Sequence, residues 1–118
     1  MPYVDGFLIA VPKRNLTRYR AMSRKAGKIW KEYGALEYRE CVGEDLKVKH
    51  VVSFIRSARA RKGEVVMFSW IVYRSKANRD RINKKIVGDP RLASMMEATS
   101  VFDPKRMAYG GFKVIVDL

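Results

Sequence analysis

The sequence predicts an α+β fold of the ferredoxin-like type, in which two helices cover one face of a four-stranded antiparallel sheet. Segments typical of strands and helices follow one another in the order β-α-β and then again β-α-β, which is the order of that fold. The chain has 118 residues, of which 47% are hydrophobic, and this is enough for one core but not for two. We therefore expect residues 1–118 to form a single domain.

The first half of the chain carries a strand, a long helix and a second strand. Residues 3–12 are rich in β-forming side chains, and Asn15 is typical of a helix N-cap. An apolar stripe with spacings of three and four predicts a helix to about Tyr33, which Gly34 would end. The stripe consists of Leu16, Tyr19, Met22, Ala26, Ile29, Trp30 and Tyr33. Alternating side chains predict the second strand over residues 35–42.

The second half begins with an irregular, exposed connection. Residues 46–63 lack a clear period, so we expect at most a short strand or a helical turn there. Residues 64–73 are the most strand-like run in the chain, and Ser75 predicts the start of a helix that continues to about Val87. We expect the core contacts of this helix to be Ala77, Ile82 and Ile86, with its cations, Arg79 among them, pointing outward.

Two further elements close the chain. Asp89 followed by Pro90 is typical of an N-cap and first helical residue, which predicts a short helix that ends near residue 96 or 98. Residues 106–117 read as the last strand, in which Gly110 and Gly111 indicate a bulge or a close approach to the backbone.

Two of the predicted strands are apolar on both faces, because residues 3–12 and 64–73 have apolar side chains at odd and even positions alike. Two helices can cover only one face of a sheet. We therefore expect a homodimer in which the sheet of a second copy covers the other face. We assign the set that contains Tyr3, Phe7 and Ile9 to the interior between the two sheets, and we expect the basic residues to lie outside the interface.

Several classes of protein are excluded by counts alone. Cys41 is the only cysteine and His50 the only histidine, so an internal disulfide, a multi-cysteine metal site and any two-histidine motif are excluded. No metal and no cofactor are expected. The longest apolar run is five residues, over residues 7–11, and no signal-like segment is found. We expect no contact with a membrane and a cytoplasmic location.

Seven short motifs extend nearly from end to end of the chain. They are YVDGF at residues 3–7, AVPK at 10–13, KEYGAL at 31–36, ECVGED at 40–45, FSWI at 68–71, DPR at 89–91 and FDPKRMAYGGF at 102–112. In combination they resemble the YbaA-like family of small bacterial proteins of unknown function. The resemblance implies a dimeric α+β barrel, an architecture shared with cofactor-independent monooxygenases and ligand-binding regulators. It supplies no catalytic residues to carry over.

Seven residues are candidates for a ligand pocket in the barrel. They are Asp5, Phe7, Tyr38, Trp70, Met107, Tyr109 and His50. Aromatic side chains on strands usually belong to the core, but in a barrel with free space they would line an apolar pocket. A carboxylate at Asp5 would need a partner, for which Arg39 and Arg106 are available; a structural ion pair is the alternative to a ligand-orienting role. An exposed loop position is the alternative for His50.

The charge balance suggests a second class of function. Lys and Arg number 25 against 12 Asp and Glu, which gives a formal net charge of +13. A cluster of Arg56, Arg59, Arg61 and Lys62 could contact nucleic acid, although no aromatic residue is interleaved with it and a solvated loop is the alternative. We favour a small organic ligand over a polyanion-binding protein and over a purely structural dimer. Whether the protein catalyses a reaction stays open.

Overall fold

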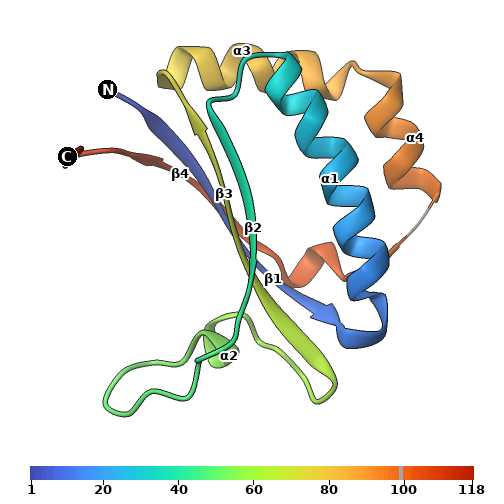
Figure 1. Cartoon of the computed structure of the whole chain (residues 1–118), viewed down its shortest axis with the longest axis vertical. Coiled ribbons are helices and arrows are strands. Elements are labelled where there is room, and N and C mark those ends of the chain that lie inside the picture. The colour runs from blue at the N-terminus through green and yellow to red at the C-terminus, as the bar shows by residue number, and fades with distance from the viewer. Residues whose placement is uncertain (99) are drawn as a thin grey trace.

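A computed structural model of the chain shows one twisted antiparallel sheet with its long helices on a single face (Figure 1). The structure describes residues 1–98 and 100–118. The strands lie in the order β2-β3-β1-β4 and are β1 (Tyr3–Pro12), β2 (Glu37–Val42), β3 (Glu64–Tyr73) and β4 (Ala108–Lys113). The helices are α1 (Leu16–Glu32), the short α2 (Phe54–Ser57), α3 (Lys76–Val87) and α4 (Pro90–Ala98). This topology confirms the predicted ferredoxin-like α+β fold.

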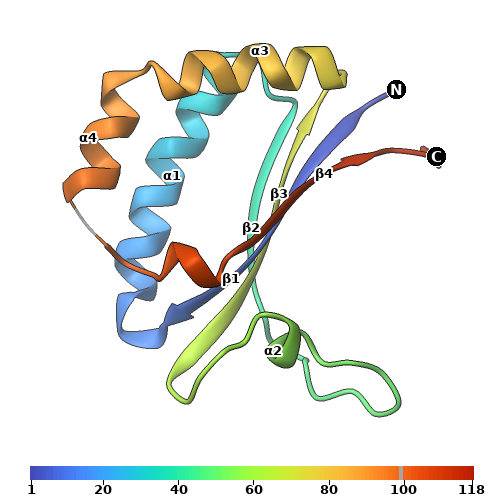
Figure 2. The same ribbon diagram turned by 180° about the vertical axis from the view of Figure 1, so that it is seen from behind.

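The helices and the longest connection lie in different parts of the molecule. Figures 1 and 2 show α1, α3 and α4 on one side of the sheet. The β2–β3 connection, which contains α2, lies at the end of the sheet opposite to α3. Two 3-10 turns, η1 (Lys13–Asn15) and η2 (Pro104–Arg106), lead into α1 and β4. The three longer helices therefore leave one face of the sheet uncovered.

The register of β1 against β3 decides which side chains lie beneath the helices. Ile9 is opposite Met67, and both pack with Val11 and with Tyr19 of α1. A second cluster joins β3 to α1, α3 and α4, and its buried members are Ile29, Ala35, Ile71, Tyr73, Ile82, Ile86 and Leu92. The set of β1 that contains Ile9 therefore faces the helices.

The assignment of this set to the barrel interior is therefore wrong. The alternate set lies on the side without the three longer helices, which we call the open face. Part of it is covered within the chain, because Val66 is buried and Phe54 of α2 packs against Phe68 with ring centroids 5.8 Å apart. The open face is formed by Val4, Leu8, Val66, Phe68, Trp70, Val72, Glu37, Arg39, Cys41 and Phe112. Both sets of β1 are apolar, so alternation alone did not distinguish them.

Local signals predicted many of the element bounds. β3 and α3 begin and end where expected, and the Ser75 side chain accepts a hydrogen bond from the backbone N–H of Asn78 at 3.1 Å. Helix α4 begins at Pro90 as predicted. The expected helical turn in the irregular connection is α2. Gly34, with a φ of +113°, follows α1 in a conformation that favours glycine.

Two local predictions are wrong, and a third holds for position only. Asn15 is the N-cap residue of α1 as predicted, but its Nδ2 donates to the carbonyl of Val101 at 3.0 Å and its side chain makes no capping hydrogen bond. Ala77 is exposed because it lies five residues from Ile82, about 140° around the helix. The last strand stops at Lys113, which pairs with the first residue of β1, so no strand remains for later residues to pair with.

A buried ion pair joins the start of β3 to η2. Arg106 donates Nη1 to Glu64 Oε1 at 2.9 Å and Nη2 to Glu64 Oε2 at 2.5 Å, and the two side chains are 12% and 9% exposed. This bidentate geometry is the strong form of such a pair. The Arg106 guanidinium lowers the pKa of Glu64 from its ordinary 4.5 to about 2.

Replacing Glu64 with Gln should destabilise the protein at pH 7 by at least about 2 kcal/mol, because the buried guanidinium loses its charged partner. A lowered carboxyl pKa contributes stability above pH 4.5, and that contribution is lost as the pH falls toward 2. Urea unfolding of the wild type and Glu64→Gln should therefore show a difference that shrinks over this interval. The exposed Glu44→Gln should show no such trend; a constant Glu64→Gln difference would contradict the role of the pair.

Candidate functional site

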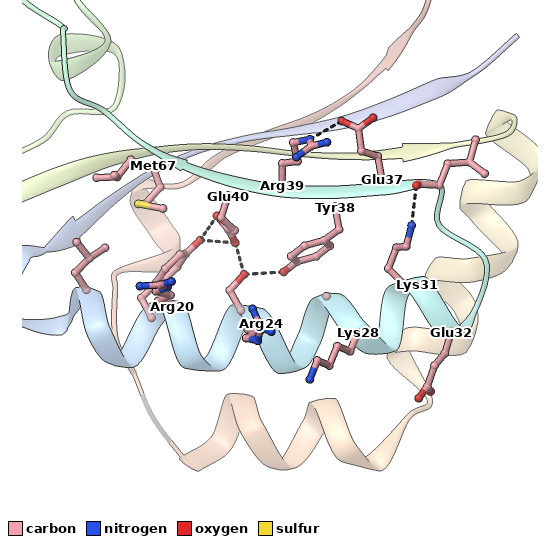
Figure 3. A pocket seen from close by; sticks show the side chains of 16 residues that line it. Arg20, Arg24, Lys28, Lys31, Glu32, Glu37, Tyr38, Arg39, Glu40 and Met67 are labelled. Atoms are coloured by element: carbon pink, nitrogen blue, oxygen red, sulfur yellow. Dashed lines mark hydrogen bonds and ion pairs between the residues drawn. The ribbon is translucent and has the colours of Figure 1, made fainter.

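A hollow with a volume of about 1080 Å³ lies between α1 and the edge strand β2 (Figure 3). Tyr38 and Glu40 extend from β2 toward α1, while Glu37 and Arg39 extend from the other side of the strand. The apolar part of its lining is formed by Leu16, Gly27, Leu36, Val42 and Met67. We call this hollow the α1–β2 groove.

Four cations of α1 line the groove. Arg20, Arg24, Lys28 and Lys31 recur at spacings of four, four and three, which places them on one side of the helix. Lys31 donates to the carbonyl of Leu36 at 2.8 Å. Among the described residues, the ion pairs include none of the other three. Their charges are therefore available to a bound anion.

The acids at the groove are already engaged. Glu32 pairs with Arg91 at 3.0 Å. Glu37 accepts hydrogen bonds from Arg39 at 3.0 Å and from Trp70 Nε1 at 2.8 Å, and the Trp70 bond, followed by that from Arg39, lowers the pKa of Glu37. The groove therefore presents an excess of positive charge.

Glu40 is the centre of a hydroxyl network at the base of the groove. Tyr19 Oη lies 2.9 Å from both carboxylate oxygens, and the hydroxyls of Ser23 and Ser69 donate to the same carboxylate. Ser23 also shares a hydrogen bond of 2.8 Å with the hydroxyl of Tyr38. The two serines are buried, so Glu40 satisfies polar groups that burial would otherwise leave without partners. The network joins α1, β2 and β3.

The two tyrosines of this network stay protonated at neutral pH. Burial raises the pKa of Tyr38 to about 12, an effect that the hydroxyl of Ser23 partly opposes. Burial, and then the charge of Glu40, raise the pKa of Tyr19 well above its ordinary value of 10. Both are therefore hydroxyl donors and not phenolate bases.

The seven pocket candidates do not come together. Tyr38 lines the α1–β2 groove, whereas Phe7 and Tyr109 stack elsewhere on the helix-covered face with ring centroids 5.0 Å apart. Trp70 lies on the open face. His50 is exposed in the β2–β3 connection, with a φ of +68°. Met107 packs against the core beside Ile9, and Asp5 lies beneath α3. The expected single pocket inside the barrel is thus divided among separate places.

Asp5 has a different partner from those expected. Its side chain is almost fully buried and lies 3.2 Å from Nε of Arg79, which α3 holds over the sheet. Arg39 and Arg106 pair with Glu37 and Glu64 instead. The prediction that Arg79 points outward is therefore wrong, because α3 turns this residue toward β1.

Gly111 makes room for this buried pair. A Cβ at Gly111 would overlap Arg79 Nη2 and lie 2.6 Å from the hydroxyl of Tyr3, and these two groups are themselves hydrogen-bonded at 3.3 Å. The close approach predicted for the two consecutive glycines is confirmed at this position.

Sequence reasoning missed Tyr19, Ser23, Glu40 and Ser69. One signal was available: Glu40 shares its alternating set with Tyr38, so it is an acid on the same side of a strand as a large aromatic ring. Nothing local indicated that two serines from other elements would meet it.

Residues 1–98 and 100–118 contain no group of three or more His, Cys, Asp or Glu side chains placed to hold a metal ion. Within the same residues, no helix is long and apolar enough to cross a membrane.

Comparison with known proteins identifies the family. Residues 2–104 match the family described as "Protein of unknown function (DUF1428)". The chain belongs to this family. It is 45% identical over 117 residues to "Uncharacterized protein YbaA" of Escherichia coli K12, with 99% of both chains covered, and the same figures hold for the protein so described from Shigella flexneri. The resemblance to the YbaA-like family is confirmed.

Solved structures support the fold alone. The Rv0793 protein of Mycobacterium tuberculosis has a TM-score of 0.61 at 14% identity, over 99% of this chain and 98% of that chain. SnoaB of Streptomyces nogalater, described as a cofactor-independent oxygenase, has a TM-score of 0.62 at 10% identity, over 99% and 96%. At these identities the likeness confirms the ferredoxin-like α+β fold and says nothing of chemistry.

A substitution at Gly27 tests how closely α1 approaches β2 at the groove. A helix interior normally favours Ala over Gly by about 1 kcal/mol, but a Cβ at Gly27 would lie 2.6 Å from two ring atoms of Tyr38. Gly27→Ala should therefore destabilise the protein, by roughly 1–3 kcal/mol. In a Tyr38→Ala background the same substitution should become neutral or stabilising. Chemical unfolding of the four proteins measures this cycle, and a stabilised Gly27→Ala single variant would contradict the close contact.

Proposed function

We propose that this protein binds a small amphiphilic organic anion in the α1–β2 groove. The observation that carries the proposal is the row of cations on α1 above an apolar and hydroxyl-bearing surface whose acids are already engaged. The proposal agrees with the sequence-based expectation of a small organic ligand, but it locates the ligand beside α1 and not inside a barrel. Pockets of this kind combine apolar walls with a few charged groups that orient the ligand.

The chemistry of the groove specifies the class of ligand. An anionic group such as a carboxylate, sulfonate or phosphate would pair with Arg20 and Arg24, since guanidinium groups recognise planar or multidentate oxygen anions. An aliphatic or aromatic body would lie against Leu36 and Met67. The carboxylate of Glu40 already accepts three hydroxyl donors, so the proposal is binding and assigns no base catalysis to it.

The fluorescent probe 1-anilinonaphthalene-8-sulfonate tests this proposal, because it joins an aromatic body to a sulfonate. Titration should show saturable binding that weakens by at least about tenfold in Arg20→Ala/Arg24→Ala, in which two charge-assisted contacts are lost. The matched control is Arg18→Ala/Lys25→Ala, which removes two cations of the same helix that do not line the groove. Equal weakening in the two double variants would mean that the net charge, not the groove, attracts the probe.

The open face supports a homodimer as part of the same proposal. Phe68 and Phe112 are 48% and 61% exposed there, and the only charges in the set, Arg39 and Glu37, pair with each other. Two copies with a net charge of +13 could therefore meet without bringing unpaired cations together. Ten-residue strands about 33 Å long, in a sheet of four strands, would bury roughly 1,000 Å² in total, near the lower limit for a specific interface. The neutral charge of this face argues against a polyanion as its occupant.

Sedimentation at micromolar concentration tests the dimer. The wild type should have about twice the chain mass of 13.6 kDa, and Phe68→Asp should be a monomer because it places a carboxylate in the apolar contact. Since Phe68 is half exposed in a single copy, the variant should still fold. Val87→Asp is the control, because Val87 is an equally apolar exposed residue at the end of α3. A monomeric wild type, or a Phe68→Asp variant that remains dimeric, would overturn this part.

A further inference from the structure

A second hollow lies in the β2–β3 connection, which Figures 1 and 2 show at the opposite end of the sheet from α3. It has a volume of about 780 Å³ and is lined by Lys47, Val48, Lys49, Ser53, Ile55, Arg56, Arg59 and Ala60. Four of these eight residues are cations and none is acidic. We call it the loop pocket.

The cations of the loop pocket come from two segments that the fold brings together. Lys47 and Lys49 precede His50, and Arg56 and Arg59 lie on and after α2. His50 and Arg59 have φ values of +68° and +56°, a left-handed backbone that is uncommon for residues other than glycine. Such conformations persist where the surrounding structure enforces them, and they are frequent at ligand sites.

The lining of the loop pocket contains no acid to balance its cations. The ion pairs found among residues 1–98 and 100–118 involve none of Lys47, Lys49, Arg56 and Arg59. Glu64, the acid at the start of the next strand, is bound to Arg106. Like charges that line one hollow repel one another, and an anion in the pocket would reduce this repulsion.

We infer that the loop pocket binds a compact oligophosphate, either inorganic or the diphosphate or triphosphate end of a small molecule. Four cations match the charge of such a group better than that of a single phosphate, and Lys and Arg are its usual partners. The hydroxyl of Ser53 donates to the carbonyl of Leu46 at 3.0 Å, so the recognition rests on the cations. This site is separate from the α1–β2 groove and does not depend on its function.

The structure also divides the basic cluster that the sequence suggested for nucleic acid. Arg56 and Arg59 line the loop pocket, whereas Arg61 and Lys62 do not. A long polyanion would contact all four cations of the basic cluster along the surface. A compact oligophosphate would contact only Arg56 and Arg59 of that cluster, because these two line the pocket. This difference supplies a matched control within the same connection.

Calorimetric titration of the full chain with sodium tripolyphosphate at low ionic strength tests the inference. We expect one binding event per chain, weakened at least about tenfold in Lys49→Ala/Arg56→Ala, which removes two of the four cations. Arg61→Ala/Lys62→Ala removes the same charge from the same connection and should change the affinity less than about twofold. Arg20→Ala/Arg24→Ala should likewise leave it unchanged, which keeps this result distinct from that of the groove.

Three comparisons complete the experiment. Orthophosphate should bind much more weakly than tripolyphosphate. Adenosine diphosphate that binds more tightly than pyrophosphate would identify the source as a nucleotide, and equal affinities would identify the phosphates alone; either result supports the site. No detectable tripolyphosphate binding, or equal weakening in the two loop double variants, would overturn it. The inference would also be overturned if a single-stranded oligouridylate bound more tightly than tripolyphosphate and lost affinity equally in the two loop double variants. That result would indicate an extended basic surface that binds a polyanion.

Discussion

The antiparallel pairing of β1 with β3 is the constraint on which the rest of the structure depends. The two strands pair over ten residues, with Tyr3 opposite Tyr73 and Pro12 opposite Glu64, and strand alternation then divides their side chains between two faces. A slip of one residue would exchange the faces. The ion pair of the buried Asp5 with Arg79 opposes such a slip, because Asp5 would move to the open face and Arg79 would keep only its exposed neighbour Asp80 as an acidic partner. A polar contact thus specifies a register that apolar residues alone leave ambiguous.

The position of the α1–β2 groove follows from a second polar contact. Glu40 of β2 accepts hydrogen bonds from Tyr19 and Ser23 of α1 and from Ser69 of β3, so it links the edge strand to the helix and to the middle of the sheet. A fully satisfied network of this kind restricts how the elements can shift relative to one another. Gly27 allows α1 to approach closely enough for these bonds, and the cations of α1 are thereby held at the side of the groove.

The sequence was sufficient to predict the elements and their order, because the signals for these are local. It was insufficient to predict the sites, because these join residues that are distant in the chain. β3, α3 and the start of α4 are marked by neighbours in the chain, such as Ser75 beside its helix and Asp89 before Pro90. The faces of β1 could not be assigned, because both of its alternating sets are apolar. The Asp5–Arg79 pair joins residues 74 positions apart in the chain, and the partners of Glu40 come from two other elements, α1 and β3. Of the seven pocket candidates only Tyr38 lines the groove.

The net charge of +13 comes from cations in several parts of the molecule. The positions of these cations say more about possible partners than the total charge does. The open face holds one arginine, paired with Glu37, so the charge does not oppose contact between two such faces there. The four cations of α1 form a straight row beside apolar side chains, an arrangement suited to an elongated ligand with one charged end. The four cations of the loop pocket surround a smaller volume, together with Val48, Ile55 and Ala60, an arrangement suited to a compact group that carries several charges. Cations arranged in these two ways would select different anions, whereas a uniformly basic surface would distinguish them only by charge.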